Sequence, residues 1–294
     1  MCLIMRQFWL VTTDHLEEGL WFRDEEDFKV GMNFVAIQAA VSPEVIVLAF
    51  ILMSNHVHFV LEGSYKEVQK FINAFKHRYS IYYRKKYGVK EFLRRNGVDI
   101  KPILLNDEAL ERAIAYVQMN CVAANICANC TQYQWGTGNN FFNPSESSGK
   151  PAGTISKRAL KRLLHTDCES IPDDWLIYDN GYILPQSYVN CKTVEALYRT
   201  PNRMNYFLQN SSKAKKRIET SEERIPAFRD QIILAALPDL CKSLFGKNSY
   251  DALSPEEQTE FVRQIRFRFS SNVNQIARVC GLSYADAAKI MDRL

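Results

Sequence analysis

Two histidines one residue apart are the first groups in this chain that could do chemistry. His56 and His58 lie in the segment Asn55–His58, directly after the apolar run Val45–Met53, and they are two of only five histidines. Because side chains alternate between faces along a β-strand, both imidazoles point to one side of the strand expected here. Two imidazoles on one rigid face supply half of a metal site. The alternative, which a bare His-x-His favours, is a pair of half-buried polar residues on a sheet face.

A second segment could complete this site. The sequence that follows Asp107 contains acidic residues and good helix formers, so it predicts a helix with Asp107 as its N-cap. Tyr116 and Asn120 are four residues apart and therefore project from one face of that helix. A phenol can act as a nucleophile, and an amide oxygen can bind a hard metal ion. Taken alone, the segment is more typical of an amphipathic helix that packs its tyrosine onto a sheet.

Five ordered blocks of the sequence together resemble the single-tyrosine HUH transposases, a family that is IS200-like. The resemblance is strongest to the subfamily associated with repetitive extragenic palindromes. The blocks are Leu20–Phe28, Phe50–Val60, Phe75–Ser80, Tyr116–Ala124 and Tyr133–Thr137. They resemble the family patterns at the first helix, the histidine strand, the second helix, the tyrosine and a following aromatic segment. The resemblance covers roughly residues 5–140, about half of the chain.

The resemblance implies a DNA transposase that cleaves and rejoins single-stranded DNA containing hairpins. It implies Tyr116 as the nucleophile and His56, His58 and Asn120 as ligands of Mg²⁺ or Mn²⁺, with no organic cofactor. It also implies a 5′-phosphotyrosine intermediate and a free 3′-OH, which can reverse the reaction and join strands without ATP. A divalent ion at such a site polarises the scissile phosphate and neutralises charge in the transition state.

The sequence departs from the family pattern at a few positions. Ser54 and Cys121 stand where the family usually has proline, and Gly136 and Thr137 replace a pair of serines. None of these changes removes a catalytic group. Because a helix-stopping proline is absent at Cys121, we expect the helix to continue past Asn120, which bears on the ligand role of that residue.

The positive charge of the chain is concentrated in one region. Between Lys76 and Lys101 there are nine Lys or Arg residues and two acidic residues, whereas the net charge of the whole chain is only +4. Basic side chains bind phosphates, and the aromatic rings interleaved here could stack on unpaired bases at about 1–3 kcal/mol per base. The alternative is a solvated helix face whose aromatic residues point into the core. The predicted DNA-binding residues are Lys76, Arg78, Arg84, Lys85, Lys86, Arg94 and Arg95.

The order of the expected elements predicts the fold. They are strands at Phe8–Thr13, Val45–Met53, His56–Glu62 and Lys101–Leu105, and helices at Glu25–Ala40, at Tyr65–Lys86 and from Asp107. This β-α-β-β-α-β-α order predicts an α+β fold, a ferredoxin-like (RRM-like) antiparallel sheet with helices on one face. The first and third strands would be central, which places the histidines in the middle of the sheet.

A chain of 294 residues with 47% hydrophobic residues fits two domains. We expect a transposase domain at 1–142, a polar linker at 143–156 and a mainly α-helical extension at 157–294, with a short basic helix at Lys157–His165. The end of the extension, near 271–294, predicts a helix-turn-helix, in which Gly281 supplies the turn and Ser283 caps the second helix. The alternative for this end is an ordinary small helical bundle.

The cysteines and the apolar runs of the sequence indicate the cellular compartment of the protein. Eight cysteines are scattered, and the C-x-x-C at Cys127 and Cys130 has no second pair at zinc-ribbon spacing, so we expect reduced thiols rather than structural zinc. The chain starts without the pattern of a signal peptide, and no apolar run approaches the ~20 residues that span a bilayer. These features predict a cytoplasmic protein without membrane contact.

Three other classes of protein are alternatives to the transposase. The first is a domesticated DNA-binding regulator that uses the C-terminal helix-turn-helix and does not cleave DNA. The second is a replication initiator or relaxase with the same His-x-His chemistry, against which the absence of a P-loop motif argues. The third is an RNA-binding ferredoxin-like module, which needs exposed aromatic residues where His56 and His58 stand. The expected partner is a single-stranded DNA hairpin, and a homodimer is also considered.

Overall fold

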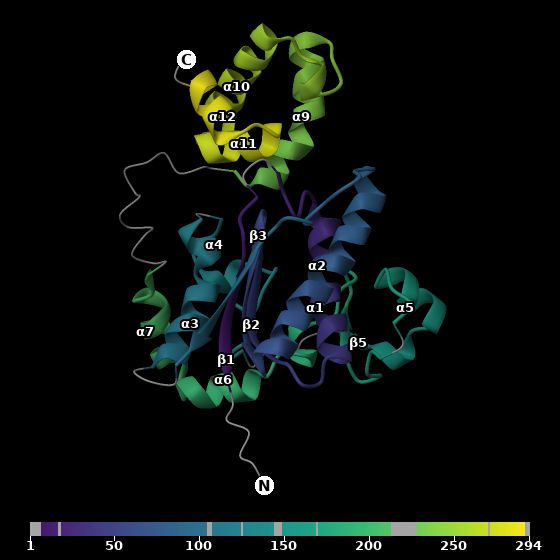
Figure 1. Ribbon diagram of the computed structural model, residues 1–294, viewed down its shortest axis with the longest axis vertical. Coiled ribbons are helices and arrows are strands. Elements are labelled where there is room, and N and C mark those ends of the chain that lie inside the picture. The colour runs from purple at the N-terminus through teal and green to yellow at the C-terminus, as the bar shows by residue number, and fades with distance from the viewer. Residues whose placement is uncertain are drawn as a thin grey trace.

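The structure is a computed structural model, and it describes residues 7–16, 19–104, 108–124, 126–143, 149–168, 170–212, 228–269 and 271–291. Four strands form an antiparallel sheet in the order β2-β3-β1-β4 (Figure 1). The strands are β1 (Phe8–Thr13), β2 (Ile46–Met53), β3 (His56–Glu62) and β4 (Val98–Ile103). The prediction that the first and third strands are central is confirmed. The fourth strand begins earlier than predicted, and Leu105 lies outside the described residues.

Two helices cover one face of this sheet. They are α1 (Glu25–Val41) and α2 (Tyr65–Tyr87), and their ends differ from the predicted ones by no more than one residue. The side chain of Asp24 accepts a hydrogen bond from the Asp27 backbone N–H at the start of α1, and Gly88 ends α2 in the left-handed conformation. On β3, the Phe59 ring lies 5.7 Å from that of Phe75 in α2. The odd-numbered side chains of β3 therefore face α2.

The prediction that the helices lie on one face of the sheet is wrong. Helix α3 (Ala109–Gln118) packs on the opposite face, where Tyr116 contacts His58 of β3. The strand β3 is buried along its whole length and β2 along nearly all of it. Strands that are apolar on both faces need a covering layer on each side, so the sheet is the middle of three layers. The helix that we predicted to carry the nucleophile supplies one of these layers.

Helix α3 ends at Gln118, before Asn120. After one non-helical residue, Met119, the chain forms the separate short helix α4 (Asn120–Ala123). The expectation that the helix with Tyr116 continues past Asn120 is therefore wrong, although a helical turn follows it. The predicted N-cap Asp107 lies outside the described residues, and the cap position is Glu108, in the left-handed conformation and without a side-chain cap hydrogen bond.

Residues 149–212 pack against the same core as the sheet rather than forming a separate body. They contain β5 (Gly149–Pro151), α5 (Lys157–Leu163), β6 (Leu176–Tyr178), α6 (Cys191–Tyr198) and α7 (Pro201–Gln209). The small sheet β5-β6 begins inside the segment that we predicted to be a linker. The buried Tyr198 hydroxyl donates a hydrogen bond to the Glu111 carbonyl of α3 at 2.6 Å. Shared packing of this kind favours a boundary after residue 212, although the division into domains stays a proposal.

A second hydrophobic core lies in the C-terminal part, among α9 (Asp230–Phe245), α10 (Pro255–Phe269), α11 (Val273–Cys280) and α12 (Tyr284–Met291). Gly281 is in the left-handed conformation between α11 and α12, and the Ser283 hydroxyl accepts a hydrogen bond from the Asp286 N–H at 3.0 Å. The expected turn and cap are therefore present. A DNA-binding helix-turn-helix at this place stays a prediction, and residues 292–294 lie outside the described residues.

The C-terminal helices lie beyond the end of the sheet where β3 begins (Figure 1). Gln231 of α9 donates hydrogen bonds to the Phe22 carbonyl at 2.9 Å and to the Ser54 hydroxyl at 3.2 Å. These contacts join α9 to the turn that precedes the two histidines. Within the described part of the chain, none of the helices combines the length and the apolar character needed to cross a membrane.

Candidate functional site

The two histidines of β3 lie on one face of the sheet, as alternation along the strand predicts. His56 is 6% exposed and His58 is 1% exposed. Their ring centroids are 4.7 Å apart and the ring planes are nearly perpendicular, at 89°. Because β3 is a central strand, the backbone hydrogen bonds on both its sides hold the rings in place.

Each histidine has a hydrogen-bonding partner at Nδ1. For His56 it is the Asn55 side-chain oxygen at 2.9 Å, and the Asn55 amide nitrogen in turn donates to the Leu16 carbonyl at 2.9 Å. An amide oxygen only accepts, so His56 Nδ1 carries the proton and Nε2 carries the lone pair. For His58 the partner is the Thr12 hydroxyl at 2.9 Å. Such outer partners orient histidines that bind metals. At His56 the partner leaves Nε2 as the ligand atom, and at His58 it does so when the Thr12 hydroxyl accepts from Nδ1.

Tyr116 approaches the histidines from α3. Its ring centroid is 5.7 Å from that of His58, and the two planes meet at 88°. The side chain is half-buried, which leaves part of the phenol accessible. Burial raises the pKa of Tyr116, and the positive charge of Lys101 offsets part of that increase. The predicted nucleophile therefore lies beside one predicted metal ligand and within the field of a cation.

Lys101 belongs to the same face of the sheet as the histidines. Thr12 of β1 pairs with His58 on one side and with Asp99 of β4 on the other, and Lys101 is two residues from Asp99. The Lys101 ammonium is 2.7 Å from the Asp99 carboxylate. Sequence reasoning did not assign a role to either residue, because their approach to Tyr116 depends on the pairing of β1 with β4.

Asn120 lies at the start of α4 and is 4% exposed. Its amide nitrogen donates hydrogen bonds to the backbone carbonyls of Tyr116 at 2.9 Å and of Val117 at 3.2 Å. These bonds direct the amide nitrogen back toward its own helix, so the side-chain oxygen is the atom that could bind a metal. They also couple the position of Asn120 to the backbone of Tyr116.

The side chains present fit a divalent cation with open positions. Two neutral imidazole nitrogens and an amide oxygen form a mixed nitrogen and oxygen set, which suits Mn²⁺ and, more weakly, Mg²⁺. Among the described residues, no group of three or more His, Cys, Asp or Glu side chains is arranged to hold a metal. The predicted set contains only two residues of those types, because its third member is an asparagine.

Sequence reasoning missed a third histidine at the site. His15 follows the end of β1, and its ring stacks on that of His56 with 3.7 Å between centroids and 13° between planes. The signal was available in principle. Because β1 and β3 are antiparallel, the chain just beyond Thr13 must lie beside the start of β3.

Two of the predicted DNA-binding residues are engaged within the protein. The Lys86 ammonium lies 2.7 Å from the carboxylates of both Asp24 and Asp27. Lys76 is buried and donates to the Asn96 carbonyl, and burial lowers the pKa of its ammonium. Their charges are therefore compensated or enclosed. The remaining predicted residues lie at or near the surface: Arg78, Arg84, Lys85, Arg94 and Arg95.

The aromatic residues interleaved with these basic side chains point inward. Tyr79 and Tyr83 are buried, and Phe92 stacks on Tyr83 with 3.6 Å between ring centroids. The Tyr82 and Tyr87 hydroxyls both donate to the buried carboxylate of Asp27, at 3.0 and 2.7 Å. The region thus combines a solvated basic face with an aromatic core, which was the alternative that we considered.

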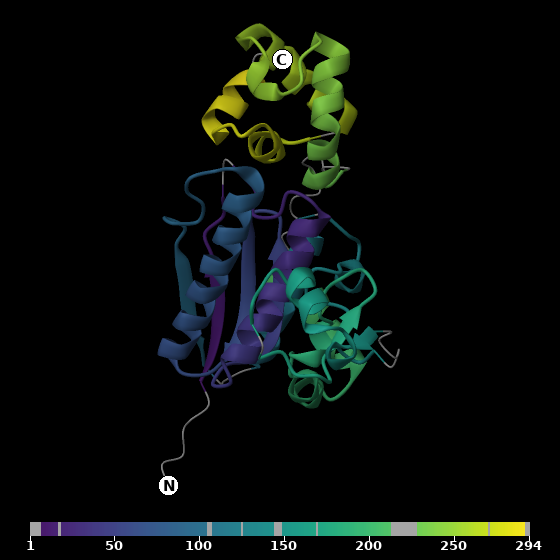
Figure 2. The ribbon, with the colours of Figure 1, turned by 90° about the vertical axis from the view of Figure 1, so that its right-hand side faces the viewer.

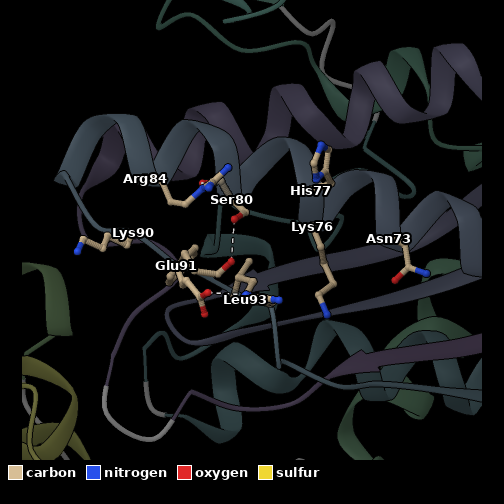
Figure 3. Close-up of a pocket in the computed structure, with 10 residues that line it drawn as sticks. Asn73, Lys76, His77, Ser80, Arg84, Lys90, Glu91 and Leu93 are labelled. Atoms are coloured by element: carbon tan, nitrogen blue, oxygen red, sulfur yellow. Dashed lines mark hydrogen bonds and ion pairs between the residues drawn. The ribbon is translucent and has the colours of Figure 1, made fainter.

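A basic cavity of about 470 Å³ lies between α2 and the segment 90–94 (Figure 3). His77, Arg84 and Lys90 line it, and Lys76 is at its base. The Ser80 hydroxyl donates to the Phe92 carbonyl at 2.7 Å and ties the segment to the helix.

The cysteines in the described part of the chain are free thiols, as expected. Cys121, Cys127 and Cys130 lie near one another after α3. A hydrogen bond with Cys127, together with burial, raises the pKa of Cys121 well above its ordinary value. Burial also raises the pKa of Cys130 to about 11, so the Cys121 and Cys130 thiols are protonated and are poor metal ligands as they stand.

The sequence model of the family described as "Transposase IS200 like" matches residues 24–97. This part of the chain is an IS200-like transposase domain. The matched residues carry both histidines together with α1, β2 and α2, whereas Tyr116 and Asn120 lie beyond them. The candidate site therefore combines both histidines of the matched part with Tyr116 of α3 and Asn120 of α4.

One solved structure similar to the chain is titled "Structure of the REP associates tyrosine transposase bound to a REP hairpin". The match has 13% sequence identity and a TM-score of 0.32, and it covers 45% of this chain and 77% of that one. None of the curated proteins matches the chain.

Proposed function

We propose that the chain is a metal-dependent DNA strand transferase that cleaves and rejoins single-stranded DNA beside a hairpin. The observation that carries the proposal is the contact between Tyr116 and His58. A phenol from α3 and an imidazole from β3 lie 5.7 Å apart between ring centroids, although they come from different layers of the fold. The IS200-like transposase domain, which contains His56 and His58, supports the assignment.

His56, His58 and the Asn120 oxygen would hold the cation. Nδ1 of each histidine has an outer hydrogen-bonding partner, Asn55 for His56 and Thr12 for His58. Nε2 would therefore be the ligand atom. When bound, Mg²⁺ or Mn²⁺ supplies a positive charge that polarises the scissile phosphate. Asn120 contributes a neutral oxygen, and this leaves the charge of the ion available to the substrate.

Tyr116 performs the covalent step. Its hydroxyl oxygen attacks the phosphorus, a new P–O bond forms to the tyrosine, and the bond to the 3′ oxygen breaks. The phenolic proton is lost to solvent, and the departing 3′ oxygen takes up a proton to become a free 3′-OH. Attack by a 3′-OH on the phosphotyrosine reverses these events, so strands are joined without an external energy source.

The partial exposure of Tyr116 agrees with a single-stranded substrate. The phenol lies in a layer between the sheet and solvent rather than at a protruding edge. A phosphate in an unpaired strand can be brought against it without melting a duplex. Lys101, which faces the phenol from β4, is suitably placed to stabilise the phenolate or the phosphate.

The test is covalent capture of DNA. The purified protein is incubated with labelled single-stranded oligonucleotides that contain a hairpin from the flanks of its own gene, with Mn²⁺ or with EDTA. On denaturing gels we expect a metal-dependent protein–DNA adduct in the wild type and none in Tyr116→Phe. Tyr206→Phe is the control, because Tyr206 is an exposed tyrosine on α7.

Two outcomes would contradict the proposal. An adduct that persists in Tyr116→Phe would exclude this nucleophile. Binding of the oligonucleotides without any adduct would favour the alternative, a DNA-binding protein that does not cleave. That alternative would assign the contact with DNA to α11 and α12, which are joined at Gly281.

A further inference from the structure

We propose that α5 and the basic rim of the cavity beside α2 (Arg84, Lys90 and Arg94) form one surface. This surface binds the phosphate backbone of a DNA duplex, which is the stem of the hairpin. The inference rests on the proposed function, because that function supplies the hairpin. It goes further because it assigns the stem to a particular surface. Half of that surface lies outside residues 24–97, the part matched by the transposase family. Single-strand cleavage and stem binding would then be separable.

The first half of the surface is the basic cavity beside α2. Arg84, Lys90 and Arg94 are exposed around it, and one acidic residue, Glu91, lies among them and pairs with Arg94 at 2.6 Å. Figure 3 shows Arg84 on the helix and Lys90 on the segment that follows it. The positive charge therefore exceeds the negative charge at this opening.

The second half is α5, whose sequence is KRALKRL. A cavity of about 670 Å³ is lined by Lys157, Arg158, Lys161 and Arg162, together with His165 and Asp167. Leu164, which is buried, fixes the end of the helix to the core, so the basic residues are held outward. The helix is anchored rather than free, and its charges form a fixed array.

Four basic side chains stand on the single short helix α5, Lys157 and Arg158 in its first turn and Lys161 and Arg162 in its last. The Lys161 ammonium lies 3.8 Å from the Asp167 carboxylate, which compensates part of this charge. A bound polyanion would compensate the remaining mutual repulsion of the basic side chains.

The residues that follow α5 pack against α2. The Arg78 guanidinium donates to the Thr166 hydroxyl at 3.4 Å, and the Tyr82 ring lies 5.4 Å from that of His165. Figure 1 and Figure 2 place α5 on the same side of the sheet as α1 and α2. A duplex that lies across α2 would therefore contact both halves of the surface.

The position of the aromatic residues favours duplex over single-stranded DNA. Tyr79 and Tyr83 are buried, and the hydroxyls of Tyr82 and Tyr87 are bonded to Asp27. Recognition of unpaired bases uses aromatic rings on which the bases stack, whereas binding to a duplex backbone uses cations. The rim of the cavity beside α2 presents cations. The nearby aromatic residues are buried or hydrogen-bonded within the fold.

The experiment compares three double variants of the full-length protein, each of which removes two positive charges. Arg158→Gln/Arg162→Gln tests α5, and Arg84→Gln/Lys90→Gln tests the cavity beside α2. Lys192→Gln/Arg199→Gln, at the two ends of α6, is the matched control. Binding of a labelled hairpin and of an unpaired strand of equal length is measured by fluorescence anisotropy in EDTA, over a series of salt concentrations.

We expect both test variants to bind the hairpin at least about tenfold more weakly than the control variant, because phosphate contacts dominate such affinities. The slope of log K against log salt should fall by about 2 in each, since each lost contact removes roughly 0.9. Binding of the unpaired strand should change less. Equal hairpin binding and equal slopes in the α5 variant and the control would overturn the proposal, as would an equal loss for the unpaired strand.

Failure of this inference can be told apart from failure of the proposed function. In the same preparations, adduct formation on the hairpin oligonucleotide with Mn²⁺ reports the chemistry of Tyr116. If the wild type forms the adduct while the α5 variant binds hairpins like the control, only the stem surface is wrong. If the wild type forms no adduct but the α5 variant loses hairpin binding and salt slope, the stem surface stands and the strand transferase does not.

Discussion

The Tyr116 ring meets the His58 ring edge-on, with 5.7 Å between centroids and 88° between planes. The two residues come from α3 and β3, and the sheet is positioned between α3 and the pair α1 and α2. The two ring planes are therefore perpendicular and not stacked. The contact brings the phenol of one layer against the imidazole of another.

Replacing the histidine that touches the nucleophile should abolish the metal-dependent step. We expect His58→Ala to reduce adduct formation by at least two orders of magnitude, on the order of the loss that follows removal of one major contributor to the transition state. The measurement is the initial rate of adduct formation at saturating Mn²⁺. Tyr206→Phe, at an exposed tyrosine on α7, should keep the wild-type rate. A His58→Ala rate near that of the wild type would exclude His58 as a metal ligand.

The Thr12 hydroxyl should tune metal affinity without contacting the metal. It lies 2.9 Å from His58 Nδ1, and Val is similar in shape and suited to a strand. We expect Thr12→Val to weaken the apparent affinity for Mn²⁺ by about 10–100-fold, the usual cost of losing an outer partner of a metal-binding histidine. A titration of adduct yield against Mn²⁺ measures it, and the yield should recover at high Mn²⁺. A loss that Mn²⁺ does not restore would indicate damage to the strand instead.

Lys101 should set the pH at which Tyr116 becomes reactive. Burial raises the pKa of Tyr116, and the charge of Lys101 lowers it in part. The phenolate attacks, so activity rises as the pH approaches the pKa from below. Removing the cation in Lys101→Met raises that pKa further, and the rising limb of the pH–rate profile should move to higher pH. Lys192→Met is the control, and a profile unchanged in Lys101→Met would contradict the role.

The sequence predicted the elements that local patterns define. The side of β3 that carries His56 and His58 follows from alternation, and the start of α1 follows from Asp24 and the acidic first turn. What the sequence did not predict depends on contacts between distant segments. The stacking of His15 on His56 arises because β1 ends where β3 begins, and the location of α3 on the far face follows from burial of both sides of the sheet.

The predicted DNA-binding set shows the same limit. Nine basic residues in one region indicate a basic face, but the sequence does not say which of their charges are already compensated. Lys86 is bound by Asp24 and Asp27, which precede it by some sixty residues. The pairing exists only because α1 and α2 pack side by side, so no local pattern signals it.

The buried carboxylate of Asp27 should be the main electrostatic contributor to the packing of α1 on α2. Asp27 is fully buried and accepts hydrogen bonds from Lys86, Tyr82 and Tyr87. Asp27→Asn removes the charge that these donors surround, and we expect the free energy of unfolding to fall by about 3 kcal/mol, at the lower end of the cost of breaking a buried pair because Lys86 is partly solvated. Urea denaturation followed by circular dichroism measures the change. Glu91→Gln, in the exposed pair with Arg94, should cost no more than about 1 kcal/mol, and equal losses in the two variants would show that burial of Asp27 adds nothing.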